Sequence, residues 1–200
     1  MRSAAYIVDD DEAIRDALCW LFQSRGVEAV AWPSAEAFLA DYRADMSGCL
    51  VLDIRMDGMS GLELFDVLTG RECAMPVIFL TGHADVPLAV AALKRGAFDF
   101  VENPFNDNEL EDSVLSAIEQ DSTQRAARAS QVSVDTSLAQ LTSREREVME
   151  LILAGKLNKV IADELNIAMR TVEVHRARIF DKMGVRSAVE LAQLLAGKRQ

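Results

Sequence analysis

The chain has 200 residues, half of them apolar, which suffices for one medium domain and one small domain with separate cores. No run approaches about 18 consecutive apolar residues and the start of the chain does not resemble a secretion signal, so we expect a cytoplasmic protein with no membrane partner. Three well-separated cysteines and two histidines offer no CxxC pair and no nucleophilic triad, which argues against disulfides, zinc and a hydrolytic enzyme.

The net charge of −11 combines two halves of opposite sign. Residues 1–121 contain 8 Lys and Arg against 23 Asp and Glu, whereas residues 122–200 contain 13 against 9. An acidic module with a net charge of −15 therefore precedes a basic module with a net charge of +4. Only the second module has the charge to attract nucleic acid.

In the first 120 residues, short β-rich apolar runs alternate with stretches of helical length. The strands are predicted at residues 5–8, 28–31, 49–52, 77–80 and 98–101. The helices are predicted at residues 13–25, 35–42, 62–69, 86–95 and 107–119, with N-caps at Ser34, Ser60 and Asn106. Such alternation predicts an α/β doubly wound five-stranded parallel sheet with helices on both faces.

The rest of the chain has a different pattern. Residues 121–140 are rich in Ser, Ala, Gln and Thr and have little apolar periodicity, so we interpret them as a linker, with helix considered only for its start. Beyond them, helices are predicted at residues 143–154, 159–165, 170–182 and 188–195, and Gly155 and Gly184 end two of these. The predicted domains are residues 1–120 and a small all-α domain at 141–200.

The residues with the most distinctive chemistry follow the predicted strands, where ligands of a doubly wound sheet collect. The first strand leads into Asp9, Asp10 and Asp11, the third into Asp53, and the fourth into Thr81. Carboxylates forced together repel each other unless a cation binds, and an all-oxygen site suits Mg²⁺. A solvated acidic rim is the competing interpretation, but the placement at several strand ends favours a metal site.

Three segments, YIVDDDEAIRDAL, CLVLDIRMDGMSGLEL and PVIFLTGHADVPLAVAALKRGAFDFVENPF, resemble a response-regulator receiver domain of the FixJ-like branch. The resemblance implies that Asp53 accepts a phosphoryl group from a sensor histidine kinase. It also implies that Asp10, Asp53 and the backbone carbonyl of Arg55 ligate Mg²⁺, with Asp9 acting through water.

The same resemblance gives roles to two further residues. Thr81 is expected to bond a phosphoryl oxygen, and Phe100 to be the aromatic residue that turns inward on activation. The plainer alternatives are an ordinary hydroxyl at a strand end for Thr81 and a core ring for Phe100. Asp11 and Glu12 are interpreted as solvated charges at a helix start.

Two positions depart from the pattern of this family. Asn103 stands where the family has a lysine that pairs with the phosphoryl group, and Asp57 stands where it usually has proline. Asparagine donates a hydrogen bond but carries no charge, which predicts weaker phosphoryl capture or a stronger dependence on Mg²⁺. The resemblance also implies a cis peptide before Pro104.

The segment LTSREREVMELILAGKLNKVIADELNIAMRTVEVHRARIFDKMGV resembles the LuxR/GerE-type helix-turn-helix, which implies binding to double-stranded DNA. Thr142 and Glu145 form a predicted capping box. On the predicted recognition helix, Val172, Ile179 and Met183 form an apolar stripe that should face the core. The outward stripe then consists of Arg170, Glu173, Val174, Ala177 and Arg178.

This outward stripe is predicted to enter the major groove. Glu173 suits cytosine N4 and Val174 suits a thymine methyl group. The residues suited to phosphates are Lys159, Arg170, Thr171, His175, Arg176 and Arg178. Solvated surface charges are the alternative for the basic residues, and an imidazole packed between helices is the alternative for His175. Ala168 supplies no capping side chain where Ser or Thr is common.

A module with so little positive charge binds DNA weakly alone, so an active homodimer on paired half-sites is expected. The resemblance implies pairing around Val90, Lys94 and Phe100, and near Leu191 and Leu195 of the last helix. Ordinary core packing is an equal alternative for these apolar residues.

The sequence thus predicts a two-component response regulator that is not an enzyme. The main alternative is a DNA-binding regulator whose atypical receiver works through protein interaction without phosphorylation. A magnesium-dependent aspartyl phosphatase is disfavoured, because Arg55 occupies the place of its second acid–base aspartate.

Overall fold

The structure is a computed structural model that describes residues 3–82 and 86–196. The chain divides into two compact units, Met1–Arg125 and Ala126–Gln200, and each is described by itself. Within the described residues, no helix is long and apolar enough to span a bilayer.

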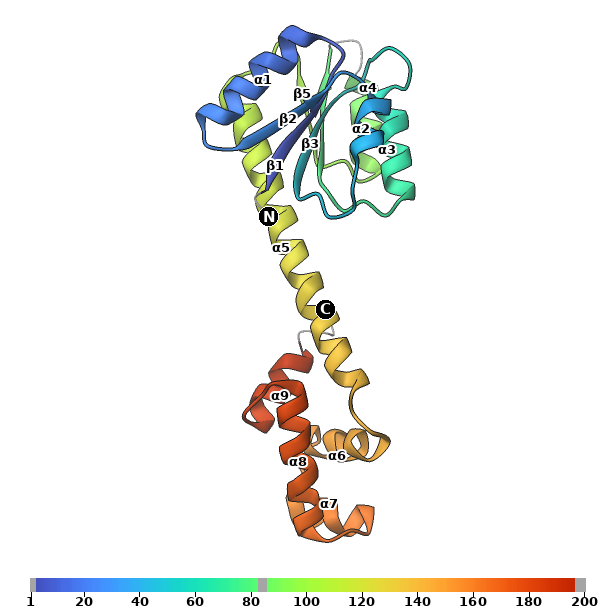
Figure 1. Cartoon of the computed structure of the whole chain (residues 1–200), viewed down its shortest axis with the longest axis vertical. Coiled ribbons are helices and arrows are strands. Elements are labelled where there is room, and N and C mark those ends of the chain that lie inside the picture. The colour runs from blue at the N-terminus through green and yellow to red at the C-terminus, as the bar shows by residue number, and fades with distance from the viewer. Residues whose placement is uncertain (1–2, 83–85, 197–200) are drawn as a thin grey trace. The chain divides into compact units, whose positions relative to one another are not determined.

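The first unit contains one parallel sheet in the order β2-β1-β3-β4-β5. Helices α1 and α5 lie on one face of the sheet, and α2, α3 and α4 lie on the other (Figure 1). The predicted doubly wound five-stranded fold is therefore confirmed. The strands are β1 (Ala4–Val8), β2 (Glu28–Trp32), β3 (Gly48–Asp53), β4 (Val77–Thr81) and β5 (Asp99–Glu102), and the helices are α1 (Glu12–Ser24), α2 (Ala35–Asp41), α3 (Gly61–Gly70), α4 (Val86–Lys94) and α5 (Asp107–Ala139).

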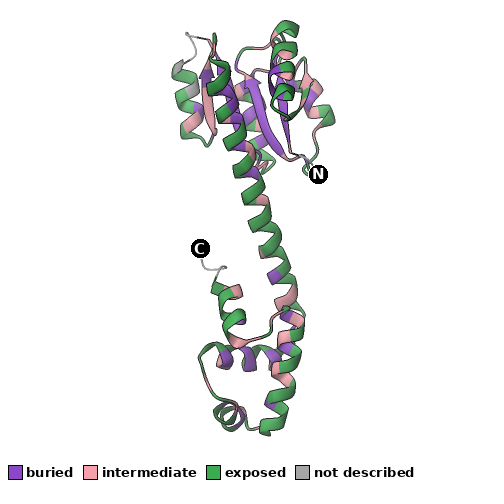
Figure 2. Cartoon of the chain, turned by 90° about the vertical axis from the view of Figure 1, so that its left-hand side faces the viewer, coloured by how far each residue is buried: buried purple, intermediate pink, exposed green. Residues whose placement is uncertain are grey.

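The central strands are apolar throughout because both faces of the sheet are covered. Along β3, Leu50 and Leu52 pack toward α2, α3 and α4, while Cys49 and Val51 pack toward α1 and α5. Figure 2 shows this buried sheet between helices whose outer faces are exposed. Each large apolar side chain buried in this way stabilises the fold by roughly 1.5–3 kcal/mol.

Strand register brings the ends of the central strands to one edge of the sheet. Val8 pairs with Leu52, and Asp53 pairs with Leu80, so the residues that follow β1 and the last residue of β3 meet at this edge. Thr81 ends β4 one residue further along. The sheet therefore gathers the polar strand ends that the sequence singled out.

Short polar side chains start the helices as expected. Ser34 caps α2 by accepting from the backbone N–H of Ala37, and Ser60 forms a capping box with Glu63 at the start of α3. The carboxamide oxygen of Asn106 accepts from the N–H of Asn108 at the start of α5. Asp11 caps α1 through the N–H of Ala13, in agreement with its interpretation as a charge at a helix start. The expected cis peptide between Asn103 and Pro104 is present.

Helix α5 is longer than the sequence pattern indicated. It continues to Ala139, well past the predicted end at residue 119, through the segment interpreted as a linker. No glycine or proline interrupts residues 107–139, so nothing breaks the backbone hydrogen bonding. The apolar periodicity is missing because most side chains of the later turns are exposed and need no apolar face.

Within the first unit, the middle of α5 is tied to the sheet by a buried carboxylate. Asp121, only 1% exposed, accepts hydrogen bonds from the N–H of Gly48 at 2.9 Å and the hydroxyl of Ser47 at 3.1 Å. The Arg125 guanidinium pairs with Asp121 at 2.7 Å and also donates to the carbonyl of Met46. Because these groups satisfy the buried charge, the first unit includes α5 as far as Arg125.

The second unit is all-helical, as predicted. Its helices are the end of α5 followed by α6 (Ser143–Leu153), α7 (Asn158–Leu165), α8 (Met169–Met183) and α9 (Ala188–Ala196). Val148, Ile161, Val172 and Ile179 are fully buried at its centre. The predicted capping box of Thr142 and Glu145 is present, and Gly184 ends α8 with a positive φ of 66°.

Glu145 also links α6 to α8. Its buried carboxylate lies 2.7 Å from the Lys182 ammonium, which also donates to the carbonyl of Gln140. The hydrogen bonds from Lys182 and from the N–H of Thr142 lower the pKa of Glu145 to about 2. The ion pair therefore holds the end of the predicted recognition helix to the start of α6.

Candidate functional site

An acidic cluster lies at the edge of the sheet where β1 and β3 end. It consists of Asp9, Asp10 and Asp53, and one carboxylate oxygen from each lies within 4.8 Å of the others. Asp9 is buried, Asp53 is half-buried and Asp10 is exposed. The structure thus brings together the three carboxylates that the sequence placed in one pocket.

Local packing fixes the backbone at Asp53. Gly61, the first residue of α3, lies so close that a Cβ there would be 2.0 Å from the backbone oxygen of Asp53. The N–H of Gly61 donates to the carbonyl of Ile54 at 3.0 Å. Any side chain at position 61 would therefore displace the strand end that carries Asp53.

The electrostatics of the cluster disfavour three negative charges. Partial burial, followed by repulsion from Asp9, raises the pKa of Asp53 from 3.8 to about 6. Burial also raises the pKa of Asp9, although its Oδ1 accepts a 2.8 Å hydrogen bond from the N–H of Asp11. In the absence of a cation, the folded state thus favours protonation of Asp53 and Asp9.

The three carboxylates of the cluster fit a hard divalent cation. All three side chains offer oxygen, and their spacing allows one ion to contact several of them. A bound cation offsets both the burial and the repulsion that raise the pKa of Asp53. Mg²⁺ usually keeps several waters at sites with few carboxylates. The acidic pocket is therefore a candidate magnesium site built around Asp53.

The other predicted residues lie on β4 and β5 or in the loops that follow β3 and β5. Thr81 is 1% exposed and its hydroxyl donates to the carbonyl of Gly82 at 3.1 Å. Asn103 is exposed just after β5, and its N–H donates to the carbonyl of Thr81 at 2.7 Å. Phe100 is half-buried on β5 and packs against the core on the α2, α3 and α4 side. Arg55 is exposed in the loop between β3 and α3.

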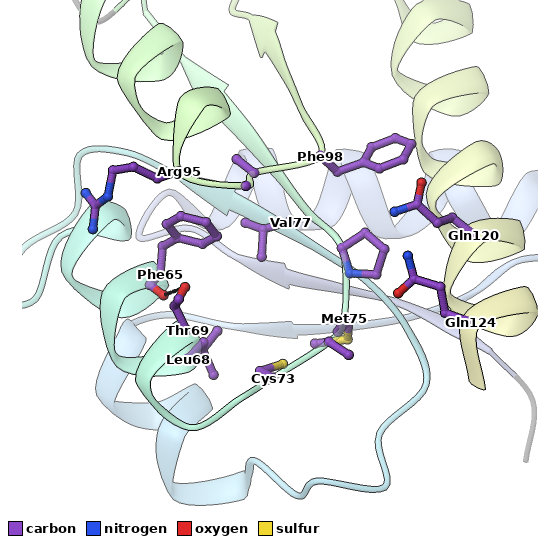
Figure 3. A pocket seen from close by; sticks show the side chains of 14 residues that line it. Phe65, Leu68, Thr69, Cys73, Met75, Val77, Arg95, Phe98, Gln120 and Gln124 are labelled. Atoms are coloured by element: carbon purple, nitrogen blue, oxygen red, sulfur yellow. Dashed lines mark hydrogen bonds between the residues drawn. The ribbon is translucent and has the colours of Figure 1, made fainter. Parts of the chain in front are cut away.

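A separate pocket of about 480 Å³ lies at the opposite end of β4 (Figure 3). Arg95 lines one side and Gln120 and Gln124 of α5 line the other, with Phe65 and Val77 between them. The guanidinium of Arg95 pairs with Asp66, so its charge is already compensated. None of the residues that line this pocket is acidic. The predicted magnesium and phosphoryl chemistry is therefore assigned to the acidic cluster at the strand ends.

Helix α8 presents the residues predicted to read DNA. Val172, Ile179 and Met183 are buried, as expected for the core stripe. The whole outward stripe is exposed, together with Lys159 of α7 and Thr171. One face of α8 therefore carries charged and small side chains that are accessible to a groove. The exposed outward residues are Arg170, Glu173, Val174, Ala177 and Arg178.

Two of the predicted phosphate contacts are less accessible. Nδ1 of His175 is buried and has no hydrogen-bond partner among the described residues, so at least this edge of the ring is turned into the domain. Arg176 is half-buried, with its guanidinium 5.3 Å from the centre of the Phe180 ring. Ala168 makes no side-chain cap to α8, as its residue type implies.

Comparison with known proteins agrees with both parts of this geometry. Residues 5–115 match the family described as the response regulator receiver domain. Residues 139–195 match the bacterial regulatory proteins of the luxR family. The chain belongs to the response-regulator family and combines a receiver domain with a LuxR-type DNA-binding domain.

Individual relatives match this chain over most of its length and of theirs. The chain is 51% identical to the C4-dicarboxylate transport transcriptional regulatory protein DctR of Rhodobacter capsulatus, covering 97% of this chain and 100% of DctR. It is 43% identical to the transcriptional regulatory protein FixJ of Bradyrhizobium diazoefficiens, covering 94% and 92% of the two chains. Among solved structures, the response regulator StyR matches with a TM-score of 0.91 and 39% identity, covering 98% of this chain and 99% of StyR. The protein is therefore a two-component transcriptional regulator of the kind represented by FixJ and DctR.

Some groups near the site were not identified from the sequence. Gly61 follows Ser60, which the sequence identified as a helix cap. Its contact with the backbone of Asp53, however, depends on how α3 packs at the end of β3. Glu36 reaches the loop after β3 from a helix 23 residues earlier, and no motif marks that contact. Only the tertiary arrangement reveals either role.

The raised pKa of Asp53 predicts a specific pH dependence. Without Mg²⁺, the folded receiver holds a proton on Asp53 that the unfolded chain releases near its ordinary value of 3.8, so stability is lost as pH rises from about 4 to about 7. Asp53→Asn removes this penalty. We expect the variant to exceed the wild type in free energy of unfolding by about 1–2 kcal/mol at pH 7, after allowance for solvent screening, and by almost nothing at pH 4.

Tryptophan fluorescence during urea unfolding measures this difference in the full-length protein, because both tryptophans, Trp20 and Trp32, lie in the first unit. Asp112→Asn on the exposed face of α5 is the matched control, for which no pH-dependent difference is expected. A constant difference between wild type and Asp53→Asn from pH 4 to pH 7 would contradict the assignment.

Proposed function

We propose that phosphorylation of Asp53 by a sensor histidine kinase controls dimerisation and DNA binding by this regulator. The observation that supports this most strongly is the convergence of Asp9 and Asp10 on Asp53 at one edge of the sheet. Such a cluster holds a divalent cation beside an attackable carboxylate.

The proposed reaction assigns a task to each residue of the site. Asp10, Asp53 and the backbone carbonyl of Arg55 hold Mg²⁺, and Asp9 contributes through water. When bound, Mg²⁺ neutralises charge on the phosphoryl group during transfer. An oxygen of the Asp53 carboxylate bonds to phosphorus as the bond from phosphorus to the kinase histidine nitrogen breaks. The Thr81 hydroxyl then turns from the carbonyl of Gly82 to a phosphoryl oxygen.

Asn103 limits this reaction in our proposal. This role is supported by its exposed position after β5 and by the hydrogen bond from its N–H to the carbonyl of Thr81, and the family resemblance implies that a lysine usually occupies this position. A neutral carboxamide supplies a hydrogen bond but no positive charge. Capture of the phosphoryl group therefore depends on Mg²⁺ more than it would with lysine.

The output is proposed to arise from pairing of two chains. Val90 is 39% exposed on α4 and Leu88 is 46% exposed, which leaves apolar surface beside Lys94 for a second receiver. In the other unit, Leu191 is fully buried in the core, so its side chain cannot contribute to an interface. We therefore place the switchable contact on α4 and β5, and the paired DNA-binding units read two half-sites.

Acetyl phosphate with Mg²⁺ tests phosphorylation of the purified protein by intact-mass spectrometry. We expect modification of the wild type that is absent in Asp53→Asn. We expect labelling about tenfold or more faster in Asn103→Lys, because a cation about 4 Å from an anion interacts by roughly 4 kcal/mol before screening at intermediate dielectric.

The other outcomes of this experiment are equally informative. Rapid, stoichiometric and long-lived modification of wild-type Asp53, unchanged in Asn103→Lys, would contradict a limiting role for Asn103. A chain that is never modified but still dimerises and binds DNA would indicate the alternative, in which the receiver acts through protein interaction alone. The comparisons do not favour that alternative.

Substitutions on α8 test the proposed DNA contacts, at a target site located by footprinting the beryllofluoride-treated protein on genomic DNA. Arg178→Ala should weaken binding to all sequences and reduce the slope of log affinity against log salt by about 1 per half-site. Glu173→Ala should leave the salt slope unchanged and relax the preference for one base pair by about 1–3 kcal/mol. Arg186→Ala, an exposed arginine beyond the end of α8, serves as the charge-matched control. Equal effects of Arg178→Ala and Arg186→Ala would refute the assignment of α8 to the groove.

A further inference from the structure

The loop between β3 and α3 is held from two sides by carboxylates that lie outside it. The N–H of Asp57 donates to Oδ2 of Asp10 at 3.0 Å, and the N–H of Met59 donates to Oε1 of Glu36 at 3.0 Å. Asp10 follows β1, whereas Glu36 lies in the first turn of α2. Two loop amides thus connect the acidic cluster to a helix that takes no part in it.

We propose that Asp57 and Glu36 are positioning residues for the magnesium site, with the Asp57 N–H orienting the Asp10 carboxylate and Glu36 fixing the loop that carries this N–H. The inference rests on the proposed function, since it concerns the same pocket. Neither side chain is assigned to the metal or to the phosphoryl group.

Asp10 is the member of the cluster that most needs such support. It is exposed, whereas Asp9 is 2% exposed and is fixed by the N–H of Asp11. Among the described residues, the N–H of Asp57 is the hydrogen-bond donor to the Asp10 carboxylate. A carboxylate has about four lone-pair sites, so one such bond leaves sites for a cation. Because the hydrogen bond fixes the rotamer of Asp10 before the cation binds, less conformational entropy is lost on binding.

The Glu36 contact is built into the loop backbone. Gly58 has a φ of 80°, and a Cβ at this position would lie 3.0 Å from Oε1 of Glu36. Glycine therefore permits both the turn and the close approach of the carboxylate. Hydrogen bonds from the backbone N–H groups of Glu36 itself and of Met59 lower the pKa of Glu36, so the acceptor stays ionised near neutral pH.

The residue type at position 57 is central to the proposal. Proline, which the family resemblance leads one to expect there, has no N–H and cannot hold Asp10. The Asp57 side chain itself is exposed and is not required for the contact. Position 57 is thus proposed to supply, through its backbone N–H, an orientation of Asp10 that a proline-containing loop lacks, and Glu36 fixes this loop through its carboxylate.

A pair of substitutions at position 57 separates the N–H from the carboxylate. Both Asp57→Ala and Asp57→Pro remove the side-chain charge, but only proline removes the N–H. Titration calorimetry of the full-length protein with Mg²⁺ should therefore show binding about three- to tenfold weaker in Asp57→Pro than in Asp57→Ala. Tryptophan fluorescence during unfolding confirms that both variants fold, since Trp20 and Trp32 report on the first unit.

Substitutions at position 36 test the proposed role of Glu36 in fixing the loop. Glu36→Ala should weaken Mg²⁺ binding by about two- to fivefold and should accelerate hydrogen exchange at the Met59 amide, even without Mg²⁺. Glu36→Gln retains a carbonyl acceptor and should restore part of both properties. Glu28→Ala removes an exposed carboxylate at the start of β2 and should change neither.

The outcomes distinguish this inference from the proposed function. If Asp57→Pro binds Mg²⁺ as tightly as Asp57→Ala, or if the Met59 amide exchanges equally fast in the wild type and in Glu36→Ala, the positioning role is refuted while the magnesium site stands. If the wild type itself binds no Mg²⁺, the proposed function fails as well.

Discussion

The burial and mutual repulsion of carboxylates at one edge of a parallel sheet are the constraint on which the proposed phosphorylation switch depends. Asp9 is buried, Asp53 is half-buried, and both lie close to Asp10, so burial and like charges act in the same direction. The result is a pKa of about 6 for Asp53, the proposed acceptor, in the absence of a cation. In the proposed function, a divalent ion offsets this effect, and the ionised Asp53 that remains acts as the nucleophile.

The fold supplies the convergence that this constraint requires. Parallel strands in the order β2-β1-β3-β4-β5 bring the carboxyl ends of β1, β3 and β4 side by side. Apolar residues on both faces hold these strands in register, and a one-residue slip would turn every side chain to the opposite face. Gly61 allows α3 to begin against the backbone of Asp53, which fixes the proposed acceptor at the end of its strand. In the second unit, buried residues on one stripe of α8 leave the opposite stripe exposed, where we propose that it contacts DNA.

Much of this could be predicted from the sequence because the relevant signals are local. Continuous apolar runs such as residues 77–80 identify buried parallel strands, and Ser34, Ser60 and Thr142 mark helix starts through their own hydrogen bonds. The acidic cluster followed from a topological rule about strand ends. The boundaries of most helices differed from expectation by only one or two residues, as is usual for helix ends.

The features that the sequence did not reveal depend on contacts between distant segments or on the absence of a pattern. The end of α5 was missed because an exposed helix needs no apolar stripe. Asp121 looked like the start of a linker, yet it is buried against Gly48, 73 residues earlier. The contact of Glu36 with Met59, and the buried Nδ1 of His175, likewise follow from packing that no short motif encodes.

The most direct test of the central claim is the number of protons released when Mg²⁺ binds. Calorimetric titrations at pH 6 in buffers with different ionisation enthalpies measure this number. A pKa of about 6 for Asp53 predicts release of about half a proton or more per ion at pH 6, and almost none at pH 8, where the site is already ionised. Binding heats at pH 6 that are identical in every buffer, or the absence of binding at both pH values, would contradict the account.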